Sequence, residues 1–136
     1  MRDILVDTNA YTAFMRGEPA IVEVMTHAPQ LFVNSVVLGE LLAGFAAGTR
    51  QAKNRSELAQ FLNSPRVGVY AITAETADSY ALVYANLRRK GQPIPSNDLW
   101  IAASALEHGA ALLSLDAHFE KVDGLRLGQS LNDFLP

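Results

Sequence analysis

Short apolar runs alternate with longer helical segments along the whole chain, and this alternation constrains the fold more than any other feature. Ile4-Leu5-Val6 is one such run, and residues 111–115 form another near the C-terminus. Both are apolar almost throughout, as expected for strands that are buried on both faces of a sheet. Strands of this kind separated by helices predict an α/β fold, in which helices cover both faces of a mainly parallel sheet.

Turn and capping residues predict where the other elements begin and end. Asn34-Ser35 offers a cap for one helix, and Ser96 or Asn97 is expected to cap another. Helices are expected over 8–16, 19–27, 36–47, 50–62, 73–90 and 98–108, further strands at 31–33, 67–72 and 125–127, and a turn or short helix at 116–119.

Length and composition predict one ordinary globular domain spanning residues 1–136. The chain is 49% apolar and 18% charged, and it has no cysteine for a disulfide or a thiolate metal site. No apolar run reaches the roughly 18 residues of a membrane span, and the N-terminus does not resemble a signal peptide. We therefore expect a cytoplasmic protein that does not bind membranes. The net charge of −3 argues against broad attraction to nucleic acid, but it does not exclude a nuclease that uses metal ions.

Two acids follow the two apolar runs described first. Asp7 comes directly after Val6, and Asp116 comes directly after Leu115. Ligands of open α/β sheets bind outside the carboxyl ends of the strands, so both acids are well placed for chemistry. Each is equally explained as a helix cap, because aspartate is favoured at that position.

Two more acids, Glu40 and Asp98, lie in otherwise apolar helical segments. Glu40 shares a helix face with Val36 and Val37, and glutamate is rarely buried without a partner. It either belongs to a site or lies at the edge of the apolar stripe and reaches water. Asp98 begins an apolar helix, where the helix dipole favours an acid.

Together the four acids suggest a metal site more strongly than any one of them does. Two unit charges about 5 Å apart repel by roughly 3 kcal/mol at an effective dielectric constant near 20. If the acids converge, a bound Mg²⁺ or Mn²⁺ would offset this repulsion, and both ions favour carboxylate oxygens. The prediction depends on convergence, which spacing alone does not establish.

Four blocks of sequence, in this order, resemble the PIN-domain ribonucleases, and most closely the VapC-type toxins of toxin–antitoxin pairs. The resemblance covers essentially the whole chain. The blocks are Asp7-Thr8-Asn9, Glu40 within Val-Leu-Gly-Glu-Leu-Leu, Asn97-Asp98-Leu-Trp-Ile-Ala-Ala, and Leu113-Ser114-Leu115-Asp116-Ala-His-Phe119 followed by Gly124-Leu125.

The resemblance implies a three-layer α/β/α fold and a metal-dependent endoribonuclease. Its catalytic, metal-binding acids would be Asp7, Glu40, Asp98 and Asp116. Thr8 and Ser114 match polar positions that line the same site, and Asn9 and Asn97 match groups that orient the acids. The cofactor would be Mg²⁺ or Mn²⁺, and the substrate a structured RNA such as a tRNA or a ribosomal RNA loop. A homodimer that a small antitoxin protein silences is also implied.

Two other functions stay open at this point. A Mg²⁺-dependent phosphohydrolase also carries an aspartate after its first strand, but its usual Asp-x-Asp motif is absent because position 9 is Asn. A non-catalytic PIN-like module that binds RNA or protein is the second alternative.

Several other residues have less specific interpretations. Arg88-Arg89-Lys90 either contacts RNA phosphates or interacts with the C-terminal end of a helix dipole. Tyr11, Phe14 and Met15 are expected in the core, and any of them that is exposed would be a candidate for a dimer or antitoxin surface. The three histidines, His27, His108 and His118, lack zinc spacing and are expected at the surface or in capping positions.

Overall fold

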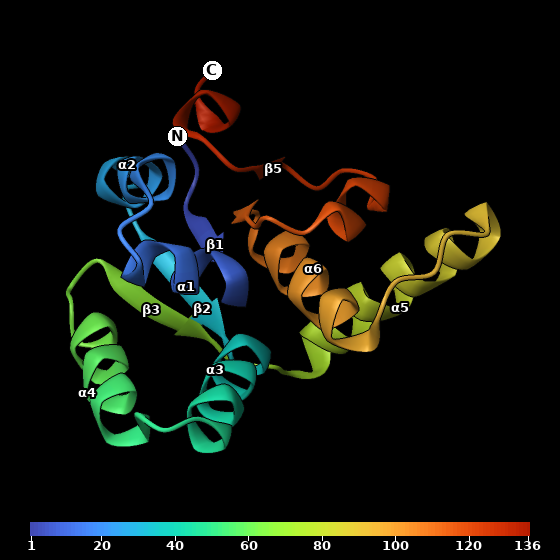
Figure 1. Cartoon of the computed structure of the whole chain (residues 1–136). Helices are drawn as coiled ribbons and strands as arrows, with labels where there is room; N and C mark the ends of the chain where they lie inside the picture. Colours follow the sequence, from blue (N-terminus) through green and yellow to red (C-terminus); the bar gives the residue numbers. More distant parts are fainter.

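A five-stranded, all-parallel sheet forms the centre of the molecule, as the computed structural model of residues 1–136 shows (Figure 1). The strand order is β3-β2-β1-β4-β5, and every neighbouring pair is parallel. The strands are β1 (Ile4–Val6), β2 (Leu31–Asn34), β3 (Val67–Tyr70), β4 (Ala111–Leu113) and β5 (Leu127–Gly128). The predicted mainly parallel α/β sheet is thus confirmed.

Six α-helices and two short 3₁₀ helices connect and cover these strands. The helices are α1 (Thr8–Met15), α2 (Pro19–His27), α3 (Ser35–Ala47), α4 (Gln51–Leu62), α5 (Ala74–Lys90), α6 (Ser96–His108), η1 (Ala117–Lys121) and η2 (Leu131–Phe134). The structure has every helix that the sequence predicted, and η2 in addition. None of them combines the length and apolar character needed to cross a membrane.

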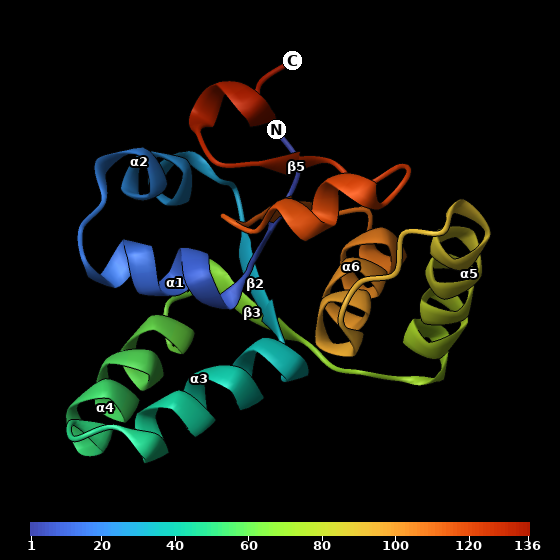
Figure 2. The ribbon, with the colours of Figure 1, turned by 45° about the vertical axis from the view of Figure 1, so that its right-hand side comes forward.

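The strand order explains why the helices form two layers. The chain moves outward from β1 to β2 and β3, and then returns to β4 on the other side of β1. Because parallel crossovers are right-handed, helices on the outward path and helices on the return path cover opposite faces. Figures 1 and 2 show this division, with α1 to α4 on one side of the sheet and α5 and α6 on the other.

The core is densest around the two central strands. Every residue of β1 and β4 is buried, and Val6 lies opposite Leu113 in the parallel register. β3 is an edge strand and is only partly buried, with Val69 46% exposed. Tyr11 is buried and Phe14 is partly buried, as predicted. Met15 was predicted in the core but is 41% exposed at the end of α1.

Several elements begin or end at other residues than predicted, and β3 ends at Tyr70 instead of residue 72. β4 ends at Leu113, so Ser114 and Leu115 lie in the following turn. The final strand is Leu127–Gly128 instead of 125–127, because Leu127 is the residue that lies opposite Leu112 in the parallel register.

Helix α6 begins at Ser96, two residues before the predicted start. Pro95 occupies the N-cap position, with φ −56° and ψ 149°, and no side chain caps the helix. The predicted cap by Ser96 or Asn97 is therefore wrong. Asn97 lies in the first turn of α6, so its side chain is free to make a tertiary contact.

Candidate active site

The two carboxyl ends of strands β1 and β4 lie side by side where the strand order reverses. β1 and β4 are hydrogen-bonded neighbours although most of the chain separates them. Asp7 follows β1 immediately, and Asp116 comes shortly after the end of β4. This reversal point is where open α/β sheets usually bind their ligands.

Asp7 is a buried carboxylate held by two hydrogen bonds. The backbone N–H of Thr8 donates to Oδ1 at 2.8 Å, and the hydroxyl of Ser114 donates to Oδ2 at 2.7 Å. Asp7 occupies the N-cap position of α1, so the capping role predicted as an alternative is present as well. Burial raises the pKa of Asp7 to about 6, with smaller contributions from the charges of Glu40 and Asp98, although the two hydrogen bonds act in the opposite direction.

Glu40 points from α3 towards the start of α1 and the start of α6. The hydroxyl of Thr8 donates to Oε1 at 2.6 Å, and the amide of Asn97 donates to Oε2 at 3.3 Å. The side chain is partly buried, and these two donors hold it in place. Glu40 therefore is not a solvated residue at the edge of an apolar stripe, which was the alternative interpretation.

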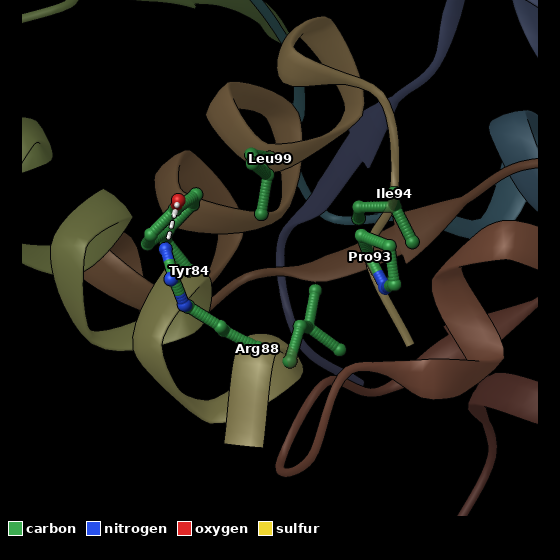
Figure 3. Close-up of a pocket in the computed structure, with 6 residues that line it drawn as sticks. Tyr84, Arg88, Pro93, Ile94 and Leu99 are labelled. Carbon is green, nitrogen blue, oxygen red and sulfur yellow. Dashed lines mark hydrogen bonds between the residues drawn. The ribbon is translucent and has the colours of Figure 1, made fainter. Parts of the chain in front are cut away.

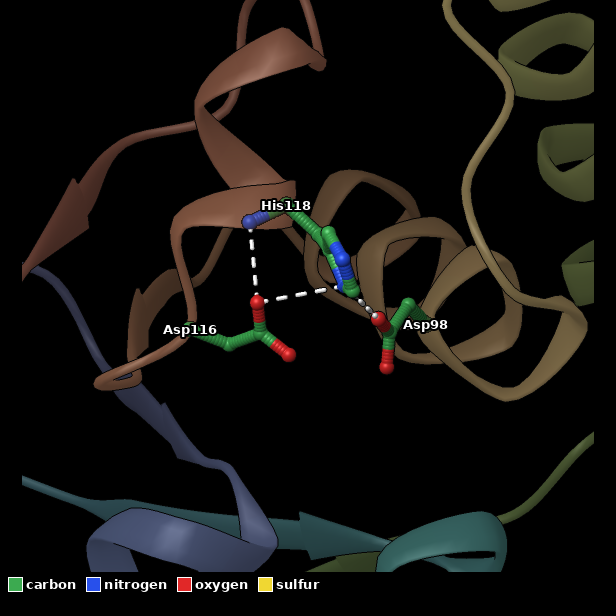
Figure 4. A group of neighbouring side chains, drawn as sticks. All are labelled: Asp98, Asp116 and His118. Carbon is green, nitrogen blue, oxygen red and sulfur yellow. Dashed lines mark hydrogen bonds and ion pairs between the residues drawn. The ribbon is translucent and has the colours of Figure 1, made fainter.

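Asp98 and Asp116 meet at the side chain of His118 (Figure 4). Nδ1 of His118 lies 3.0 Å from Oδ2 of Asp98 and 3.2 Å from Oδ1 of Asp116. Burial raises the pKa of Asp98, and the charges of Asp116 and Glu40 add to the increase, whereas His118 lowers the pKa. Asp116 also caps η1, because its Oδ1 accepts the backbone N–H of His118 at 2.9 Å.

Sequence reasoning missed the contact of His118 with these acids. It predicted a surface or capping role, and the side chain is indeed 46% exposed. The available signal was the position of His118 two residues after Asp116, at the start of a predicted turn. The contact with Asp98 depends on how α6 packs against η1, which no local pattern specifies.

Asn9 lies beside the site but contacts no acid. Its Oδ1 accepts the backbone N–H of Leu115 at 3.0 Å, which connects α1 to the turn before Asp116. Asn97, by contrast, contacts Glu40 directly. The two asparagines therefore differ, and Asn9 acts on the acids only through the backbone.

The four acids are linked through Asp98, which interacts electrostatically with each of the other three, and they have few nearby cations. Glu40 and Asp98 both raise the pKa of Asp7, and Asp116 raises that of Asp98. No lysine or arginine forms an ion pair with any of the four. Ligand atoms of Asp98, Asp116 and His118 all lie within 4.8 Å of one another, whereas Asp7 and Glu40 are not part of this group. Acids arranged in this way suit a divalent cation, because hard cations prefer carboxylate ligands and would offset the mutual repulsion.

A separate pocket of about 190 Å³ lies between α5, the loop after it and the start of α6 (Figure 3). None of the four acids lines it. Arg88 lies at its wall and donates from Nη1 to the hydroxyl of Tyr84 at 3.2 Å. Lys90 pairs with Asp123 at 2.9 Å. Two of the three adjacent cations thus have partners within the protein, and contact of this segment with RNA stays a prediction.

Known proteins resemble this chain in sequence along most of its length. The model of the PIN domain family matches residues 4–125. Ribonuclease VapC4 of Mycobacterium tuberculosis is 36% identical over 86 residues, which cover 62% of this chain and 65% of that protein. The tRNA(fMet)-specific endonuclease VapC of Shigella flexneri is 28% identical over 129 residues, which cover 93% of this chain and 96% of the relative.

The fold itself matches solved structures. In the crystal structure of DNA-bound VapBC from Salmonella typhimurium, one chain superposes with a TM-score of 0.82 at 24% identity. The match covers 94% of this chain and 98% of that one. At 24% identity this likeness establishes the three-layer fold alone. The chemistry has to be argued from the residues of the site.

Proposed function

The chain belongs to the PIN domain family, and we propose that it is a VapC-type endoribonuclease toxin that cuts RNA with the help of a divalent metal ion. The observation that carries this proposal is a series of four acids near the reversal point of the sheet: Asp98 interacts electrostatically with Asp7, Glu40 and Asp116, and no lysine or arginine pairs with any of the four. Relatives named as VapC ribonucleases support RNA as the substrate class.

The residues that would hold Mg²⁺ or Mn²⁺ are Asp7, Glu40, Asp98 and Asp116. When bound, such an ion lowers the pKa of a water molecule and stabilises the charge that develops on a phosphate oxygen. The remaining polar residues fit a role in orienting these acids, since the hydroxyl of Thr8 contacts Glu40 and that of Ser114 contacts Asp7. Groups of this kind fix the direction of ligand oxygens before the metal arrives.

RNA of defined shape is the proposed substrate. The Shigella relative is named for cleavage of tRNA(fMet), and we extend to this chain only a structured RNA, such as a tRNA or a ribosomal RNA loop. The proposed partners are a small antitoxin protein, which VapBC structures of relatives support, and a second copy of the chain. Residues 1–136 would act as one domain in this assembly.

Incubating the purified protein with total RNA in Mn²⁺ or in EDTA would test the proposal. The Asp7→Asn variant removes the charge of one acid while it keeps the shape of the side chain. Asp78→Asn on the exposed side of α5 removes one charge from a residue without a contact to the site, so it serves as a matched control. We expect wild-type protein and the control to cut RNA in Mn²⁺ only, and Asp7→Asn to lose cleavage.

Two results would contradict this expectation. Equal cleavage by wild type and Asp7→Asn would show that the reaction occurs elsewhere or comes from a contaminant. If neither protein cuts total RNA, purified tRNA or ribosomal RNA under conditions where Mn²⁺ binding is measured directly, the chain is a non-catalytic binding module.

A further inference from the structure

His118 is the only basic side chain that contacts any of the four acids. The ion pairs of Arg16 and Lys90 lie elsewhere, with Glu18 and Asp123. We propose that His118 is a positioning residue, which holds the carboxylates of Asp98 and Asp116 in the arrangement that binds the metal ion. This inference rests on the proposed function, because it assigns these two acids to the metal site.

The contacts of the imidazole ring define its tautomer. Nδ1 faces two carboxylate oxygens, at 3.0 Å in Asp98 and 3.2 Å in Asp116. Because carboxylates accept hydrogen bonds, Nδ1 carries the proton and shares it between them. The other ring nitrogen, Nε2, has no hydrogen-bond partner in the protein. The proposed role requires only this Nδ1–H donor.

The backbone around the ring is held by hydrogen bonds within the turn that carries Asp116. The N–H of His118 donates to Oδ1 of Asp116 at 2.9 Å, and the N–H of Asp116 donates to the hydroxyl of Ser114 at 3.0 Å. The next residue, Phe119, is 1% exposed and anchors η1 in the core. The ring therefore belongs to a rigid turn.

This arrangement connects two acids that come from different parts of the fold. Asp98 lies in the first turn of α6 and Asp116 lies after β4, so their separation depends on how two elements pack. Two like charges at short range repel each other, and a shared donor offsets the repulsion. Oδ1 of Asp98 and Oδ2 of Asp116 accept no hydrogen bond from the protein, and no dashed line reaches them in Figure 4. These are the oxygens that remain for a cation.

Two substitutions separate positioning from other roles. His118→Ala removes the donor, whereas His118→Asn places an amide N–H close to the position of Nδ1. We would titrate Mn²⁺ alone into each folded protein by isothermal calorimetry, and record nitrogen hyperfine coupling of bound Mn²⁺ by pulsed electron paramagnetic resonance. RNA cleavage is measured in parallel.

We expect His118→Ala to bind Mn²⁺ about 10–100-fold more weakly, in line with other groups that orient metal ligands. His118→Asn should recover most of the affinity and most of the cleavage, and wild-type Mn²⁺ should show no nitrogen coupling. Nitrogen coupling that disappears in His118→Asn would make His118 a ligand and overturn the inference. Recovery of affinity without recovery of cleavage would also overturn it, because the ring would then act on RNA.

The outcomes also distinguish this inference from the proposed function. If wild-type protein binds Mn²⁺ and His118→Ala binds it equally well, the inference fails and the nuclease proposal stands. If Mn²⁺ affinity depends on His118 as expected but no RNA is cut, the nuclease proposal fails and the positioning role stands. If wild-type protein binds no Mn²⁺, both are wrong.

Discussion

The hydroxyl of Ser114 donates a 2.7 Å hydrogen bond to Oδ2 of Asp7 and thereby connects the ends of the two central strands. The same hydroxyl accepts the backbone N–H of Asp116 at 3.0 Å. Ser114 is fully buried, so neither contact has water as a substitute. One side chain thus fixes an acid from the N-terminal end of the chain against the turn that carries an acid from the C-terminal end.

Replacing Ser114 by alanine should weaken both folding and metal binding. The change leaves the N–H of Asp116 without this acceptor and Asp7 without one of its two donors, and a buried polar group left unpaired costs about 1–3 kcal/mol. Because the Ser114 hydrogen bond lowers the pKa of Asp7, its loss should raise the pH at which Mn²⁺ binds.

Denaturant unfolding and Mn²⁺ titration across pH measure the two effects. Ser114→Thr keeps the hydroxyl and is the control; equal stability of wild type and Ser114→Ala would contradict the prediction.

Neutralising Asp7 should stabilise the metal-free protein at neutral and alkaline pH. In the folded protein the pKa of this carboxyl rises from 3.8 to about 6. The folded state therefore holds the proton of Asp7 more tightly than the unfolded chain does. Ionisation of Asp7 therefore lowers the free energy of unfolding. The loss of stability begins as the pH rises above 3.8 and reaches its full value above pH 6. At about 1.4 kcal/mol per pKa unit, the cost is on the order of 3 kcal/mol.

We accordingly expect Asp7→Asn in EDTA to unfold at a higher denaturant concentration than wild type at pH 8. The difference should shrink as the pH falls from 6 towards 4. Asp78→Asn should follow wild type at every pH. A difference that is independent of pH would show that the substitution acts through packing instead of charge.

Thr8 should matter for metal binding more than for stability. Its hydroxyl donates to Oε1 of Glu40 at 2.6 Å, and the residue is only partly buried. Thr8→Val preserves the shape and removes the donor, so Mn²⁺ affinity and RNA cleavage should both fall by about 10–100-fold. Thr8→Ser keeps the donor and should stay close to wild type. If Thr8→Ser loses as much as Thr8→Val, the methyl group is the important part of the side chain.

Gly128 in β5 should tolerate no side chain. A Cβ at this position would lie 2.5 Å from Cβ of Asp133 and 2.7 Å from Cζ of Phe134, both in η2. Gly128→Ala should therefore destabilise the fold by about 1–3 kcal/mol, as overpacking usually does. Gly44→Ala in α3 meets no atom within 4 Å and is the control; it should stabilise the helix by about 0.5–1 kcal/mol. Denaturant unfolding compares the two, and a neutral Gly128→Ala would show that η2 moves away at little cost.

Local sequence predicted an element correctly where short-range preferences alone determine its structure. The apolar strand at Ile4–Val6, the cap at Asn34 and the helix Pro19–His27 all follow from short-range preferences, and all were predicted. The position of β5 was predicted wrongly because its register with β4 decides it. The start of α6 was a local error, because Pro95 takes the N-cap position and the helix begins at Ser96.

By itself, the sequence determined the class of the fold, the order of its elements and the identity of four candidate acids. These depend on the period of apolar residues and on motifs that are local in the chain. Only the tertiary structure decided which groups meet: Thr8 with Glu40, Ser114 with Asp7, and His118 with both Asp98 and Asp116. The physical reason is that these contacts cross between helices and strands. Their distances depend on how the elements pack, and no periodicity along the chain encodes that packing.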